Sequence, residues 1–300
     1  RLVCYKTLHA LTDRRLYGVR AGSDEERRQY DEIKKEALTL SLVQSTFVIV
    51  LLGVVFDGPN VTGIVMEWAN AGSLLAYLKA RRATMTPKQL MWVLVSALID
   101  TLKGLVAVHG KSITHRDVKP ENILVCDEYG SLTMKLGDVG IAKQLDVGTN
   151  TMTGTPATMA PEVPLGNYDE KVDVYSLGVT ICMLWVKFGA VGEPRLNLSV
   201  MNLETQRVVI DDAVTQARDV FPAVADVLAR MTAHPAGDRY SALEALEAMQ
   251  AILPDLLDQN SALQTQLRDA NDRIEAQQDV VRRLVSNRVR LADYRTASAT

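Results

Sequence analysis

One polar stretch of the sequence carries an acid, a base and an amide at fixed offsets: His115-Arg116-Asp117-Val118-Lys119-Pro120-Glu121-Asn122. An Asp can accept the proton of an attacking hydroxyl, and a Lys two residues later can neutralise charge on the group being transferred. The Asn that follows can hold a metal ion. Next comes the apolar run Ile123-Leu124-Val125, which predicts a strand. A solvated polar loop before a strand is the alternative, and the combined spacing favours a catalytic loop.

A further acidic residue follows after one turn and one more predicted strand. Residues 127–131 predict the turn and residues 132–136 the strand, and Asp138 comes next, in Gly137-Asp138-Val139-Gly140. Most isolated Asp-x-Gly sequences are simply turns. This one follows the polar stretch after a predicted strand, a turn and a second strand. A functional role for Asp138 is therefore the stronger interpretation.

Both stretches resemble motifs of eukaryotic protein kinases, namely the H-R-D-x-x-x-x-N catalytic loop and, with Val139 in place of Phe, the D-F-G motif. A Lys two residues after the Asp is typical of Ser/Thr-directed members. The resemblance implies catalytic roles for Asp117, Lys119 and Asn122. It also implies that Asn122 and Asp138 bind the Mg²⁺ that bridges the phosphates of ATP. The phosphoryl acceptor would be a Ser or Thr hydroxyl of a protein substrate.

The nucleotide-binding part of the predicted site departs from the family pattern at the positively charged residue, which is Arg20 where the family has Lys. Tyr17-Gly18-Val19-Arg20 lies where the family has V-A-I-K, whose Lys pairs with the α/β-phosphates and with a helix Glu. In that register the Glu is Glu36, for which an ordinary surface charge is the alternative. Arg20 keeps the positive charge, but its planar guanidinium does not reproduce the geometry of an ammonium group. Lys6 is a second choice, because its predicted strand lies further from the helix in the sequence.

The remaining nucleotide contacts also follow from the resemblance. Met66 would be the gatekeeper beside the adenine, and the backbone of Glu67 and Ala69 would meet the purine edge. Contacts with ATP are implied as well for Val3, Gly18 and Leu124. The glycines of the phosphate-binding loop would fall at or before residue 1, so that they are either cut off or absent.

The first seventy residues show the patterns of a small, strand-rich unit. Apolar and β-branched residues predict strands over residues 2–8, 15–20, 48–56 and 63–68. Residues 24–42 are charged on one face and apolar at helical spacing, which predicts a helix. Strand, strand, helix, strand, strand is the order of a kinase small lobe.

The following segment shows the helix signals of a larger unit. Ser73 is a suitable N-cap for a helix over residues 74–80, and Thr86-Pro87 begins a longer one. The longer helix has a broad apolar stripe from residue 90 to residue 108, as a buried scaffold helix does. The resemblance implies two supporting contacts further on: Asp173 holds the backbone of the catalytic loop, and Arg239 pairs with Glu162.

Residues 143–162 resemble an activation segment that ends in Ala160-Pro161-Glu162. Phosphate on Thr151 would pair with Arg116 through charge-assisted hydrogen bonds. A mobile loop hydroxyl is the alternative for each Thr of this segment. Thr155 suits a position beside Asp117 in the pocket for the substrate hydroxyl. Residues 187–219 match no motif of the family.

The tail changes character from residue 256, where the sequence becomes polar and lacks both Gly and Pro. Apolar residues recur with a heptad period up to residue 291, which predicts a coiled coil and a homodimer through residues 256–291. Asn260 at a core position favours two strands. A long helix packed on its own domain is the alternative.

The composition narrows the class of protein further. Hydrophobic residues make up 47% of the 300 residues, enough for a substantial core, and the net charge of −3 argues against electrostatic binding to nucleic acid. Three isolated Cys residues favour a reducing compartment. No apolar run without charges is long enough to span a bilayer, so we expect a cytoplasmic protein without a membrane span.

The sequence therefore predicts an α+β, bilobal protein-kinase-like fold, with a small β-rich lobe, a large mostly helical lobe and a C-terminal coiled-coil helix. The expected boundaries are 1–69, 70–254 and 255–300. The resemblance covers residues 2–250 and is closest to the tyrosine-kinase-like group of Ser/Thr kinases. The expected function is ATP-dependent phosphorylation of protein Ser or Thr residues. A pseudokinase scaffold, with impaired ATP handling through Arg20, is the alternative.

Overall fold

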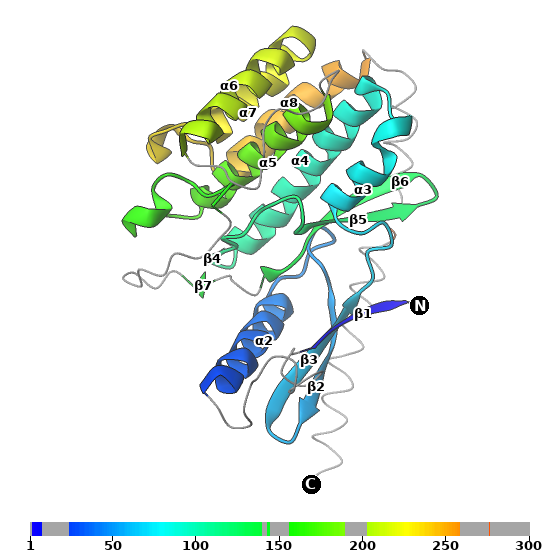
Figure 1. Cartoon of the computed structure of the whole chain (residues 1–300), viewed down its shortest axis with the longest axis vertical. Helices are drawn as coiled ribbons and strands as arrows, with labels where there is room; N and C mark the ends of the chain where they lie inside the picture. Colours follow the sequence, from blue (N-terminus) through cyan, green and yellow to red (C-terminus); the bar gives the residue numbers. More distant parts are fainter. Residues whose placement is uncertain are drawn as a thin grey trace.

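The chain forms two lobes that meet at a narrow junction, as a computed structural model shows (Figure 1). The structure describes residues 2–7, 24–139, 143–144, 156–189, 203–258 and 276. The bilobal α+β architecture predicted from the sequence is confirmed. Gly18, Arg20, Thr151 and Thr155 lie outside the described residues, as do the strand predicted over residues 15–20 and nearly all of the predicted coiled coil.

The small lobe consists of a three-stranded antiparallel sheet and one helix. The strands are β1 (Val3–Thr7), β2 (Leu51–Asp57) and β3 (Asn60–Glu67), in the order β1-β3-β2. The helix is α2 (Asp24–Leu42), with the bounds that the sequence predicts. Ile33, Ala37 and Leu40 are buried, at the helical spacing that turns one face of α2 toward the sheet.

The large lobe is mostly helical. Its helices are α3 (Leu74–Arg81), α4 (Pro87–His109), α5 (Lys171–Gly189), α6 (Leu203–Val220), α7 (Pro222–Met231) and α8 (Ala242–Asp258). Single 3₁₀ turns are η1 (Arg82–Thr84), η3 (Val163–Leu165) and η4 (Ala236–Asp238). Two small sheets face the small lobe, namely β5 (Ile123–Glu128) with β6 (Ser131–Leu136), and β4 (Ile113–Thr114) with β7 (Lys143–Gln144).

Local sequence signals explain where two of these helices begin. Ser73 caps α3, because its hydroxyl accepts a hydrogen bond from the backbone N–H of Ala76. Thr86 and Gln89 form a capping box at the start of α4, and Pro87 occupies its first turn. Both N-caps are as predicted.

Helix α4 is the central scaffold of the large lobe. Its segment Gln89–His109 is long and apolar enough to cross a membrane by length and composition, yet 78% of its most apolar window is buried inside the molecule. It packs against both α5 and α8, and in Figure 1 it runs alongside α5 and ends close to β4. The sequence-based interpretation as a buried scaffold helix is confirmed, because that apolar surface is covered by the protein itself.

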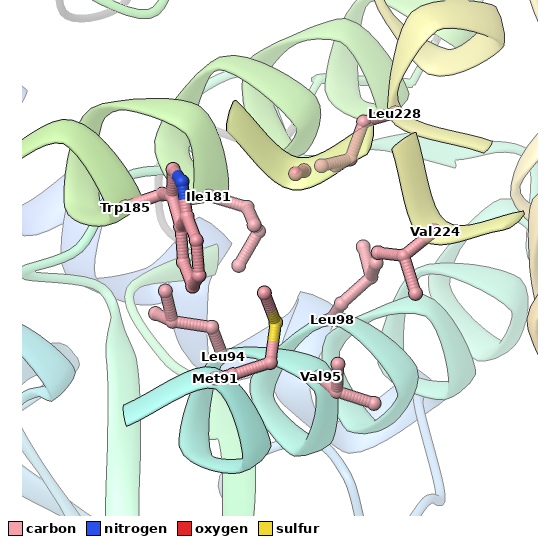
Figure 2. Close-up of a pocket in the computed structure, with 9 residues that line it drawn as sticks. Met91, Leu94, Val95, Leu98, Ile181, Trp185, Val224 and Leu228 are labelled. Atoms are coloured by element: carbon pink, nitrogen blue, oxygen red, sulfur yellow. The ribbon is translucent and has the colours of Figure 1, made fainter. Parts of the chain in front are cut away.

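A small apolar cavity of about 10 Å³ remains where α4, α5, α6 and α7 meet. Figure 2 shows side chains from three sides converging on it, including Met91 and Val95 from α4 and Trp185 from α5. Its lining is entirely apolar: Met91, Leu94, Val95, Leu98, Ile181, Trp185, Ala217, Val224 and Leu228. A space of this size is about the minimum for one water molecule, and nothing polar lines it to hold one.

The two lobes are joined by two neighbouring segments of chain. The segment after α2 is bonded to β6: the N–H of Ile49 donates to the carbonyl of Leu136 at 2.9 Å, and Leu136 donates to Phe47 at 2.8 Å. The segment after β3 is bonded to β5, where the N–H of Val125 donates to the carbonyl of Gly72 at 2.7 Å. Both connections are therefore hydrogen-bonded to the large-lobe hairpin β5–β6.

Helix α8 passes without interruption through the predicted domain boundary at residues 254/255. It continues to Asp258 even though Pro254 lies inside it. Leu256, predicted as the first core position of the coiled coil, is 5% exposed and packs in the core of the large lobe. At Leu256 the structure therefore agrees with the alternative prediction, in which the helix packs on its own domain.

Candidate active site

The catalytic-loop residues lie together between β4 and β5. Asp117 is 3% exposed, and its Oδ2 accepts hydrogen bonds from Lys119 Nζ at 2.6 Å and from Asn122 Nδ2 at 2.9 Å. Asn122 Nδ2 also donates to the backbone carbonyl of Asp117 at 2.8 Å. The structure thus brings together the three residues expected to be catalytic. Lys119 and Asn122 both donate to the same carboxylate oxygen of Asp117.

The backbone of this loop is fixed from beneath by Asp173 at the start of α5. Its carboxylate accepts the N–H of His115 and the N–H of Arg116, both at 2.7 Å, and it contacts His109 Nε2 at 2.8 Å. Burial opposes ionisation of Asp173, but these hydrogen bonds, first of all the one from His109, outweigh it and lower its pKa. Arg116 has a φ of +70°, an uncommon conformation that the two bonds hold in place.

Asp138 is placed next to this loop through Gly137. The carbonyl of Gly137 contacts His115 Nε2 at 2.9 Å, and its N–H donates to the carbonyl of Asn122 at 2.8 Å. A Cβ at residue 137 would lie 2.8 Å from a methyl group of Leu124, so a larger residue here would require the side chain of Leu124 to move. Val139, which stands where the family has Phe, is fully buried in the core.

The cation of the site is Lys6, on β1. Its Nζ lies 2.9 and 2.7 Å from the carboxylate oxygens of Glu36 and 3.0 Å from Asp138 Oδ1. Burial lowers the pKa of Lys6, but the charges of Glu36 and Asp138 outweigh it and raise the pKa above its usual value. Burial raises the pKa of Glu36, and Lys6 opposes this rise. The Lys6–Glu36 pair joins β1 to α2, and the Lys6–Asp138 pair joins it to the D-x-G segment.

This arrangement reverses the ranking of the two candidate cations. Arg20 was the first choice opposite Glu36 and Lys6 the second, yet the described partner of Glu36 is Lys6, while Arg20 lies outside the described residues. Sixteen residues separate the end of β1 from the start of α2, and that separation does not prevent the contact. Val3, expected near the phosphate-binding loop, instead begins the strand that carries Lys6 and lies opposite Glu67. The strand Val3-Cys4-Tyr5-Lys6 therefore occupies the place sought at residues 17–20.

The residues expected around adenine lie at the junction of the lobes. Met66, at the end of β3, lies opposite Cys4 of β1. Met66 and Leu124 are half-buried and pack on a small cluster made of Ile49, Ala69 and Cys126. Because strand side chains alternate between faces, Cys4 shares a face of β1 with Lys6. The expected contacts Met66, Ala69 and Leu124 are thus brought together, next to the strand that carries the cation.

Glu67 has a structural role that the sequence analysis missed. Both of its carboxylate oxygens accept from Lys135 Nζ, at 2.9 and 2.8 Å, and Oε1 also accepts the N–H of Val50 at 2.8 Å. The side chain of Lys135, on β6, is only 5% exposed. A Lys between apolar residues of a predicted strand was the signal for a buried ion pair. The pair links the end of β3 to the large lobe.

Asp138 and Asn122 offer oxygen ligands that suit Mg²⁺. The carboxylate of Asp138 is 42% exposed, and the amide nitrogen of Asn122 is bonded to Asp117, which leaves the amide oxygen on the other side. Mg²⁺ usually takes one or two such protein ligands and completes its shell with water and phosphate oxygens. Among the described residues no group of three or more His, Cys, Asp or Glu side chains could hold a metal ion by itself. The donor set fits a metal shared with a phosphate ligand.

The expected pair between Arg239 and Glu162 is confirmed. The two lie 2.5 and 3.2 Å apart at their two contacts, and the side chain of Arg239 is fully buried. The arginine also lies over the ring of Tyr175, 4.8 Å from the centroid. This pair ties the end of the 156–162 segment to the large lobe.

Comparison with known proteins gives a consistent result. The family described as "Protein kinase domain" matches residues 3–249. The Ser/Thr-protein kinase cst-1 of Caenorhabditis briggsae is 40% identical over 154 residues, which is 50% of this chain and 29% of that protein. CLA4 of Candida albicans is 37% identical over 49% of this chain and 15% of its own length, and hippo of Drosophila melanogaster is 38% identical over 50% and 22%. The chain therefore spans less than a third of the length of these relatives.

Proposed function

Since the chain belongs to the protein kinase family, we propose that it transfers the γ-phosphate of ATP to a Ser or Thr hydroxyl of a protein substrate. The observation that carries this proposal is the pairing of Lys6 with both Glu36 and Asp138. Through this pairing Lys6, which can bind phosphate, contacts Asp138, which is expected to bind the metal. The buried Asp117 belongs to the neighbouring catalytic loop. The relatives named above are Ser/Thr kinases, which supports the same acceptor class.

In this proposal Asp117 orients the acceptor hydroxyl and takes its proton. Its Oδ2 is bonded to Lys119 and Asn122, so the carboxylate is held in one orientation. Lys119 is 24% exposed at its side chain and can turn toward negative charge on the transferring phosphoryl group. Positioning and electrostatic stabilisation supply most of the catalysis in reactions of this kind.

On the nucleotide side, Lys6 would hold the α- and β-phosphates, and Glu36 would keep its ammonium group in place. Asp138 and Asn122 would hold Mg²⁺, which neutralises phosphate charge when it is bound. Met66, Leu124 and the backbone of Glu67 and Ala69 would receive the adenine. Mg²⁺ and ATP thus remain the proposed ligands, with Lys6 taking the place first given to Arg20.

The alternative of a pseudokinase scaffold rested on Arg20 in place of the family's Lys and on the unseen glycine-rich loop. The Lys6–Glu36 ion pair, with a shortest N–O distance of 2.7 Å, supports the enzyme over this alternative. The homodimer through residues 256–291, the cytoplasmic location and the phosphorylation of Thr151 beside Arg116 stay proposals.

A phosphate-transfer assay with radiolabelled ATP tests the proposed function. We expect transfer by the wild type and a loss of roughly 10²- to 10⁴-fold in Asp117→Asn, because the proton acceptor is removed. Mg-ATP should still raise the unfolding temperature of Asp117→Asn, since that residue is not a nucleotide contact. Arg20→Lys should transfer at the wild-type rate. Absence of both transfer and the Mg-ATP thermal shift in the wild type would favour the scaffold.

A further inference from the structure

Gln206 of α6 is a fully buried polar residue that makes four hydrogen bonds with two other parts of the large lobe. Its Nε2 donates to three backbone carbonyls, those of Pro156 at 3.0 Å, Ala157 at 2.9 Å and Met159 at 3.3 Å. Its Oε1 accepts from the hydroxyl of Tyr175 at 3.2 Å. One amide group therefore holds the backbone of a whole segment, residues 156–159. The sequence region around it matches no motif, so sequence reasoning missed this residue.

The amide can take only one orientation in this setting. Burial raises the pKa of Tyr175 to about 12, so the hydroxyl stays protonated and donates. If the amide were reversed, its oxygen would face three carbonyl oxygens, none of which can donate. The three carbonyls therefore fix Nε2 as the donor to the segment, and Oε1 is left to accept from the hydroxyl of Tyr175.

The held segment lies beside the catalytic loop. Met159 and Ala160 line the same small cavity as Arg116, the neighbour of Asp117 in the sequence. Ala157 and Thr158 are buried, so the course of the backbone here is set by packing as well as by Gln206. Because the segment shares this cavity with the neighbour of Asp117, we expect a polypeptide that presents a side-chain hydroxyl to Asp117 to pass close to it.

The segment and the nearby Glu162 are held by one buried network. Gln206 holds residues 156–159 and Arg239 holds Glu162. Tyr175 contacts both holders, Gln206 through its hydroxyl and Arg239 through its ring. Helix α6 thus reaches the segment directly through Gln206, while α5 supports Gln206 through Tyr175. A shift of α6 would be passed to the backbone that flanks the catalytic loop.

We propose that Gln206 is a positioning residue for the polypeptide substrate: it fixes the backbone of residues 156–159, over which the substrate chain docks. The inference rests on the proposed kinase function and deepens it. Gln206 touches neither the nucleotide residues nor Asp117 in the described contacts, so its effect should fall on the polypeptide substrate and not on ATP.

Gln206→Glu is the sharpest variant, because it keeps the size of the side chain and replaces both N–H donors with an acceptor. We expect the KM for a peptide substrate to rise roughly tenfold, as loss of about 1.4 kcal/mol of hydrogen bonding would give. The KM for ATP should stay at the wild-type value. Gln216→Ala, a Gln half-buried on the same helix, is the matched control and should change neither constant.

A second measurement is independent of activity. Hydrogen exchange followed by mass spectrometry should show the amides of residues 157–160 exchanging at least roughly tenfold faster in Gln206→Glu. Tyr175→Phe, which removes only the hydroxyl, should give a smaller rise in exchange at the same residues and serves if Gln206→Glu does not fold. Exchange and peptide KM at wild-type values in these variants would overturn the inference. A wild type without transfer would instead refute the proposed function, while the exchange result would still decide the role of Gln206.

Discussion

Lys6 makes two ion pairs in very different surroundings. Its contact with Glu36 is largely shielded from solvent, because the side chain of Glu36 is 5% exposed. The side chain of Asp138 is 42% exposed. The pair with Glu36 is therefore the one that holds the ammonium group, and the more exposed Asp138 is free to exchange partners when phosphate and metal arrive.

Lys6→Met should lower kcat/KM for ATP by at least roughly 10²-fold, since the phosphate cation is lost. It should also lower stability, because Glu36 stays buried without its partner. In the double variant Lys6→Met/Glu36→Gln the stability should recover while the activity does not. Steady-state kinetics and thermal unfolding measure the two effects. An active Lys6→Met protein together with an inactive Arg20→Met protein would restore the first assignment.

Glu67 and Lys135 give the second prediction at this scale. Lys135→Met leaves the carboxylate of Glu67 without its buried partner, so the free energy of unfolding should fall by about 3 kcal/mol. Lys135→Met/Glu67→Gln should regain part of this loss, because Gln can still accept the N–H of Val50. Denaturant unfolding of the wild type, both single variants and the double variant measures the coupling. Strictly additive losses would contradict the pair.

At the scale of elements, α5 supports the catalytic loop through one buried carboxylate. Asp173 has a lowered pKa, so its contribution to stability is fully present above the ordinary value near 4 and is lost as the pH falls through the folded value. Asp173→Asn should be less stable than the wild type by roughly 3 kcal/mol at pH 7, through loss of charge-assisted hydrogen bonds. The difference should narrow below about pH 4. Unfolding curves at several pH values check this, and a difference independent of pH would contradict it.

The cavity between α4, α5, α6 and α7 offers a gain in stability. Val95 lines it, and Figure 2 shows this side chain beside the open space. Val95→Ile adds one methylene group and should raise the free energy of unfolding by about 0.8 kcal/mol. Val179→Ile, at a fully buried position of α5 outside the cavity, is the control and should lower stability by overpacking. Thermal unfolding distinguishes the two directions.

The elements were largely predictable, and the registers between them were not. The bounds of α2 and the caps Ser73 and Thr86 follow from local periodicity and hydrogen-bonding residues, which the sequence displays directly. Lys6 was ranked second because the prediction relied on distance along the chain, whereas β1 pairs with β3, some sixty residues later. Lys135 and Gln206 were missed because their partners are set by tertiary packing, which local patterns do not encode.

At the scale of the whole molecule, the described part of the large lobe ends with α8 at Asp258. Because Leu256 is buried in the core, a truncation that tests the proposed dimer should keep residues up to 258. We expect the full chain to sediment as a dimer and a chain ending at residue 258 as a monomer. The same number of chains per particle in both proteins would refute the dimer through residues 256–291. Gln216→Ala in the full chain should leave the mass unchanged.

The two connections between the lobes also restrict how they can move. The segments around Ile49 and around Gly72 are both bonded to the hairpin β5–β6, so these stretches belong mechanically to the large lobe. We therefore expect relative motion of the lobes to be concentrated near Val50 and Trp68, beyond these bonded stretches. The separation between Lys6 and Asp138 should then change mainly by a hinge motion at these two places, because larger displacements of the connecting segments would break their hydrogen bonds to the hairpin.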